Sequence, residues 1–158
     1  MGTTRREALK TGGGATLLAL LAAAGWLTPG SSAQAQTWNK TAFDAKTLDE
    51  TMKALGGGPP AQSKDVAFVS TPDIAENGAV VPIGIASGIP KTESIAILIE
   101  KNPNMLAASF DIPAGTDPAV STRVKMAQTS NVHALVKADG KYYVATKEIK
   151  VTLGGCGG

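Results

Sequence analysis

The sequence has one cysteine, one histidine and an aromatic content of only 4%. A single cysteine cannot form a disulfide within the chain, and one cysteine with one histidine leaves a zinc or copper site short of ligands. No glycine-rich loop with a following lysine comes after a strand-like run, so a phosphate-binding loop is not indicated. The acidic residues are scattered and suggest no carboxylate pair for acid–base catalysis. These shortages favour a protein with no self-contained active site and no cofactor of its own.

The N-terminus has the three regions of an export signal. Arg5 and Arg6 precede an uncharged run rich in alanine and leucine over 15–27, and small residues follow it up to Ala35. This order is typical of a secretory signal, and the paired arginines favour the twin-arginine pathway. An ordinary export signal with an incidental Arg-Arg pair is the alternative. We predict a twin-arginine signal peptide over 1–35 and a periplasmic location for the mature protein.

Removal of residues 1–35 changes the charge balance. The segment holds three of the 15 basic residues and one of the 13 acidic residues, so the mature part keeps twelve of each and loses the whole-chain net charge of +2. A neutral domain without a basic cluster gives no electrostatic reason to expect nucleic acid or an anionic membrane as a partner.

The mature sequence predicts one short helix followed by many strands. Over 43–55, Leu48, Met52 and Leu55 share one helical face, which we expect to cover the core of the domain and not to form a cofactor site. The glycines and prolines of 56–60 end the helix. Beyond it, short β-rich runs alternate with proline, glycine and asparagine, and Asp139-Gly140 is a hairpin signal. About seven such runs are present: 65–70, 79–86, 94–100, 105–112, 120–128, 131–138 and 142–153. The pattern predicts an all-β, immunoglobulin-like antiparallel sandwich over 36–153.

The last run leads into a glycine–cysteine tail, residues 154–158, of sequence Gly-Gly-Cys-Gly-Gly. Alternation directs Ile149, Val151 and Leu153 inward, so we expect strand pairing to continue almost to the glycines. The tail itself is predicted to be a flexible arm, because glycine has no Cβ to restrict its backbone. Cys156 lies three residues beyond Leu153, a reach of about 10 Å at full extension.

Several roles are open for Cys156. A thiol enzyme would need the tail to fold onto His133, which alternation places opposite Val132 and Ala134 and which we interpret as a surface or cross-strand residue. A structural or interaction protein would use Cys156 for an intermolecular disulfide. Alternatively, the tail is a frayed terminus and its cysteine is incidental. A carrier would hold a small cargo on the sulfur and present it to successive enzymes, which raises the effective concentration of the cargo at each.

The chain resembles the SoxY family, the sulfur-carrier subunits of the bacterial Sox thiosulfate-oxidation system. The resemblance rests on the twin-arginine signal, the helix, the Pro-Asp-Ile-Ala-Glu-Asn-Gly stretch at 72–78, the stretch at 96–104 and the glycine–cysteine tail. It implies a periplasmic heterodimer with SoxZ, itself an immunoglobulin-like sandwich. It also implies that thiosulfate-derived sulfur is attached covalently to Cys156.

The same resemblance implies three enzymes that act on this sulfur. The c-type haem enzyme SoxXA would conjugate thiosulfate to Cys156, the manganese-dependent hydrolase SoxB would release sulfate, and the molybdenum enzyme SoxCD, where present, would oxidise the remaining sulfur. Haem, manganese and molybdenum would belong to these partners, and the chain itself would be a non-catalytic carrier. The arm would enter each active site because its flanking residues have no side chains; these are Gly154, Gly155, Gly157 and Gly158.

Overall fold

The computed structural model describes residues 39–153, which belong to one compact unit. Arg5 and Arg6 of the predicted signal, and the whole predicted arm with Cys156, lie outside the described residues. Within the described part, no helix is long and apolar enough to cross a membrane. Residues 39–153 form two short helices and nine strands: α2 Lys40–Asp44, α3 Leu48–Ala54, β1 Ala61–Gln62, β2 Val66–Val69, β3 Ile74–Ala75, β4 Val81–Ser87, β5 Thr92–Ile99, β6 Leu106–Asp111, β7 Ala119–Val124, β8 Ser130–Ala138 and β9 Lys141–Val151.

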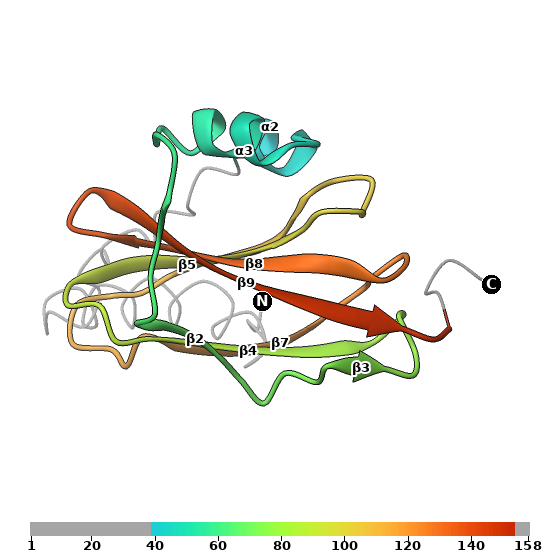
Figure 1. The fold of residues 1–158 in the computed structure, drawn as a ribbon. Helices are drawn as coiled ribbons and strands as arrows, with labels where there is room; N and C mark the ends of the chain where they lie inside the picture. The colour runs from blue at the N-terminus through green and yellow to red at the C-terminus, as the bar shows by residue number, and fades with distance from the viewer. Residues whose placement is uncertain (1–38, 154–158) are drawn as a thin grey trace, which may run out of the picture. The chain divides into compact units, whose positions relative to one another are not determined.

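The strands form two sheets that pack face to face. The six-stranded sheet has the order β1-β9-β8-β5-β6, with β3 also paired to β9, and the three-stranded sheet has the order β2-β4-β7. The pairings are antiparallel except that β1 and β3 run parallel to β9. Figure 1 shows three layers, with the helices on one side of the large sheet and the small sheet on the other. The predicted all-β sandwich is confirmed, and each of the seven predicted runs overlaps one strand.

The two central strands of the large sheet are buried on both faces. In β5, Ile95, Ile97 and Ile99 pack in the core between the sheets, whereas Ala96 and Leu98 pack beneath the helices. A strand covered on both sides is apolar throughout, which explains why 94–100 reads as a continuous hydrophobic run and lacks alternation. The large sheet is therefore the middle layer of the domain.

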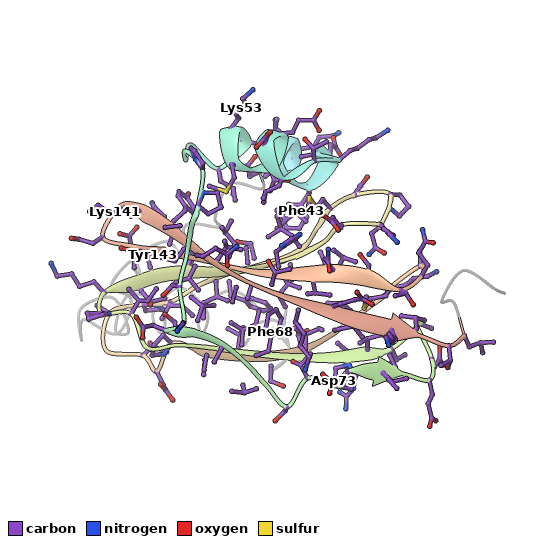
Figure 2. All side chains as sticks on the ribbon, in the orientation of Figure 1. Phe43, Lys53, Phe68, Asp73, Lys141 and Tyr143 are labelled. Atoms are coloured by element: carbon purple, nitrogen blue, oxygen red, sulfur yellow. The ribbon has the colours of Figure 1, made fainter. Side chains whose placement is uncertain are left out.

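The helical segment differs from the prediction of a single helix. The first helix ends at Asp44, because the backbone of Ala45 is extended, with a ψ of 140°. The second helix begins after its N-cap residue, Thr47. Thr47 accepts a hydrogen bond from the backbone of Glu50 and the Glu50 carboxylate accepts one from the backbone of Thr47, a capping box that starts α3. Met52 of α3 is buried against the large sheet as predicted. Figure 2 shows Phe43 on the sheet side of the helices and Lys53 pointing away.

The end of β9 corrects a second expectation. Ile149 is fully buried and Val151 packs against the core between the sheets, as alternation predicts. Leu153, which was also expected to point inward, is 66% exposed. That expectation was wrong because β9 ends at Val151 and the chain bends at the two residues that follow, although their backbone is still hydrogen-bonded.

Candidate functional site

The predicted site is Cys156, and the described chain ends three residues before it. The structure therefore shows the strand end to which the cysteine-containing tail is attached. We call residues 150–153 the arm root. They lie between β8 on one side and residues 71–80 on the other, a segment that contains β3 and that we call the strap.

On one side, the antiparallel pairing with β8 holds the arm root. The β8–β9 ladder extends from Lys141 to Ile149, which is paired with Ser130. One step further, the Val151 amide donates a 2.9 Å hydrogen bond to the Thr129 hydroxyl. The side chain of Thr129 thus extends the ladder beyond Ser130, the first residue of β8.

On the other side, the strap follows the arm root in parallel. The Lys150 amide donates to the Asp73 carbonyl at 2.9 Å, and the Thr152 amide donates to the Ala75 carbonyl at 3.1 Å. The Thr152 hydroxyl donates to the Glu76 carbonyl at 3.1 Å. Ala75 is buried in the core between the sheets, so this short strand is itself anchored.

The strap then reaches the last described residue. The Gly78 amide donates a 2.8 Å hydrogen bond to the Leu153 carbonyl, and the Gly78 carbonyl accepts a 2.7 Å hydrogen bond from the Met126 amide. The Asn77 side-chain oxygen accepts a 2.8 Å hydrogen bond from the Ala79 amide, which closes the turn around Gly78. Backbone bonds therefore continue to Leu153, although its side chain is exposed.

Lys147 fastens the start of the strap to β9. Its ammonium group donates to the Thr71 carbonyl at 2.7 Å and lies 3.0 Å from a carboxylate oxygen of Asp73, which is labelled beside β3 in Figure 2. The sequence analysis gave Lys147 no role. A signal was available, because Lys147 interrupts the inward-facing series of β9, whose other members pack on the core: Tyr143, Ala145, Ile149 and Val151.

His133 lies on the opposite, helix-side face of the large sheet and is only 9% exposed. Its Nδ1 atom is 2.8 Å from the hydroxyl of Thr146, its neighbour across the strands. Its Nε2 atom is buried without a hydrogen-bond partner and lies 3.8 Å from a Glu100 carboxylate oxygen. Burial lowers the pKa of His133 below its usual 6.5, and the Glu100 carboxylate opposes this shift. The cross-strand interpretation is confirmed and the surface interpretation is wrong.

This geometry argues against catalysis that combines His133 with the tail. The Nε2 atom has essentially no accessible surface, so a thiol from outside the domain could not reach it unless this face of the sheet opened. Within residues 39–153, no group of three or more histidine, cysteine, aspartate or glutamate side chains could hold a metal ion. What residues 39–153 provide for the predicted site is therefore a strand end that hydrogen bonds hold in place.

Comparison with known proteins identifies the cargo class. A family described as "Sulfur oxidation protein SoxY" matches residues 51–156, a range that includes Cys156. Together with the sandwich and its firmly held final strand, this match defines a carrier protein of sulfur oxidation. The chain belongs to the SoxY family.

Two solved structures illustrate the similarity. The sulfur carrier protein SoxY from Chlorobium limicola f thiosulfatophilum is 40% identical, and the alignment covers 67% of this chain and 96% of that chain with a TM-score of 0.60. A superoxide reductase (neelaredoxin) from Ignicoccus hospitalis is 17% identical over 54% of this chain and 78% of that chain, with a TM-score of 0.47. At that level nothing about function follows. No curated protein matches the chain.

Proposed function

We propose that this protein is a periplasmic carrier whose Cys156 holds thiosulfate-derived sulfur while other enzymes oxidise that sulfur to sulfate. The observation that carries the proposal is the arm root: the backbone is held on both sides up to Val151 and by the strap up to Leu153, three residues before the only cysteine. The match to the SoxY family, which extends through Cys156, supports sulfur as the cargo.

The first step would load the thiol. Cys156 and thiosulfate would join through a new S–S bond to give a cysteine S-thiosulfonate, with loss of the thiol proton and of two electrons. The electrons would pass to the haem of SoxXA. Cys156 would supply the sulfur nucleophile.

The later steps would unload it. Water would attack the terminal sulfone sulfur in the active site of SoxB, break its bond to the neighbouring sulfur, and release sulfate and a proton while Cys156 keeps a persulfide. Where SoxCD is present, it would oxidise the outer sulfur of the protonated persulfide to a sulfonate with oxygen from three water molecules, removing six electrons and seven protons. A second hydrolysis would then release sulfate and restore the thiol.

The contribution of this chain to the cycle would be presentation of the cargo. A fixed root and a slim tip of four glycines would let Cys156 enter deep active sites of different shapes while the intermediate stays attached. We further propose export by the twin-arginine pathway through Arg5 and Arg6, and a stable pairing with SoxZ. Haem, manganese and molybdenum would remain with the partner enzymes.

Intact-protein mass spectrometry tests the carrier role. The protein is purified from the periplasm of cells grown on thiosulfate and measured before and after reduction, beside a Cys156→Ser variant prepared in the same way. We expect mass additions that fit a thiosulfonate or extra sulfur atoms, that map to the C-terminal peptide and that reduction removes. The Cys156→Ser variant should carry none.

Other outcomes would contradict the proposal. A disulfide-linked dimer as the sole species, inert toward thiosulfate, would indicate the alternative of a structural or interaction protein that pairs through Cys156. A bare thiol under these growth conditions would also count against the carrier. Sulfur additions that persist in Cys156→Ser would place the cargo on another residue.

A further inference from the structure

The strap makes contacts that the sandwich fold does not require. Its start is held by Lys147, its middle pairs with Lys150 and Thr152, and its end bonds the carbonyl of Leu153 through Gly78. Each of these partners lies in β9 or in the arm root. The side chains at its outer positions, Ile74 and Val80 among them, are exposed, so core packing alone does not account for the course of the segment.

We propose that the strap is a positioning device that sets where the free arm begins, with Asn77 and Lys147 as its positioning residues. The inference rests on the proposed carrier function and adds a structural determinant of it. Asn77 holds the turn that directs the Gly78 amide to the Leu153 carbonyl, and Lys147 holds the start of the strap against β9. With both in place, the segment that must reach from the domain surface into a partner's active site consists of residues 154–156.

The length of the free segment determines how often Cys156 occupies a partner's active site. If the strap detached and the arm root frayed to Lys150, the free segment would grow from three residues to six. Effective concentration falls roughly as the −3/2 power of tether length, so doubling that length lowers it about threefold. The carrier would still dock as before, but a smaller share of docked carriers would have the thiol inserted.

The test compares variants that change the strap without changing the core. Asn77 is exposed, so Asn77→Ala removes the acceptor of the turn at little cost in packing, and Asn77→Asp restores an acceptor oxygen. Lys147→Met releases the start of the strap and provides an independent second variant. Asn104→Ala is the matched control, because Asn104 is also an exposed asparagine but lies outside the strap.

Two measurements are made on the full mature chain with its partner subunit. The first is the steady-state rate at which the sulfate-releasing hydrolase discharges charged carrier. We expect kcat to fall about threefold in Asn77→Ala and Lys147→Met with KM unchanged, and to return in Asn77→Asp. A purely structural defect would instead lower the fraction of folded carrier, which raises the apparent KM and leaves kcat unchanged at saturation.

The second measurement needs no sulfur chemistry. A nitroxide attached to Cys156, the only cysteine, broadens the amide NMR signals of residues that it approaches. In the wild type and in Asn104→Ala we expect this broadening to be concentrated on the loops next to the arm root. In the two strap variants it should extend over more of the domain and become weaker at its maximum.

The outcomes separate the two proposals. If the NMR broadening spreads over the domain in the strap variants but kcat does not change, the positioning role is overturned while the carrier function stands. Broadening identical in all variants would show that the strap does not hold the arm root, which also overturns the inference. If wild-type Cys156 takes up no sulfur, the carrier proposal fails, and with it the reason to assign the strap a role in catalysis by the partners.

Discussion

Gly84 offers the sharpest test of how β2, β4 and the start of the strap pack together. It is buried in the middle of β4, where it is paired with Val69 of β2 and with Ser121 of β7. A Cβ at this position would overlap the Val69 carbonyl oxygen and would lie 3.1 Å from both the carbonyl carbon and a methyl group of Val69. The obstacle is largely backbone, so β2 would have to move for Gly84→Ala to fit.

The expected cost has two parts. Overpacking of this kind costs about 1–3 kcal/mol. The Thr71 hydroxyl also bonds the Gly84 amide at 3.0 Å and the Gly84 carbonyl at 3.1 Å, and each such bond contributes about 0.5–1.5 kcal/mol. If β2 moves far enough to break both bonds, the two parts sum to about 2–6 kcal/mol, which lowers Tm by about 8–24 °C for a domain of this size.

Gly58→Ala is the matched control. An added Cβ at Gly58 meets no atom within 4 Å, and its backbone is not in the left-handed region. The substitution restricts the unfolded chain and should change stability by between zero and about 1 kcal/mol in the favourable direction. Thermal unfolding followed by circular dichroism compares the two. If Gly84→Ala melted within about 2 °C of Gly58→Ala, the reasoning on β2 and β4 would be refuted.

Three further predictions concern the arm, the histidine and the helices. Gly155→Val should slow charging and discharging of Cys156 because a branched side chain thickens the tip, while Tm stays unchanged; normal rates in a sulfur-transfer assay would remove the argument for a slim arm. The pKa of His133 is lowered by burial, so the unfolded chain takes up this proton more readily and the free energy of unfolding should fall as the pH drops below about 6.5. Urea unfolding measured over this pH range should show that the free energy of unfolding depends less steeply on pH in His133→Gln than in the wild type. An equal pH dependence in the two proteins would exclude His133 as the cause. Thr47→Ala removes the acceptor for the Glu50 amide at 3.2 Å and should cost about 1 kcal/mol in urea unfolding, whereas no loss would show that the capping box does not stabilise α3.

The sequence was sufficient for features that depend on neighbours along the chain. Asp139 and Gly140 both adopt positive φ, 50° and 72°, and join β8 to β9 as the hairpin signal predicts. The stripe of α3 packs where it was expected to pack because its helical spacing depends only on local residues. The break at Ala45 was missed, although Thr47 and Glu50 have the spacing of a capping box.

Features that depend on distant contacts were not predicted. β3 has only two residues, and it is a strand because the end of β9, far along the chain, lies beside it. The burial of His133 was missed because alternation tells which face a residue occupies and not whether another layer covers that face. For the candidate site, the tail motif located the thiol, but the strap that ends at Gly78 became visible only once the fold placed it against Leu153.

The direction of β9 has a mechanical consequence. The strand runs without interruption from Lys141 to Val151 and is paired with β8 over nearly all of this length. Its ladder bonds lie perpendicular to the strand, so tension on the chain beyond Leu153 would pull along β9 and load the bonds together in shear. A strand peeled sideways would lose them one after another under a much smaller force. If the proposed carrier cycle operates, this geometry would let partner enzymes pull repeatedly on the C-terminal end without drawing the final strand out of the sheet.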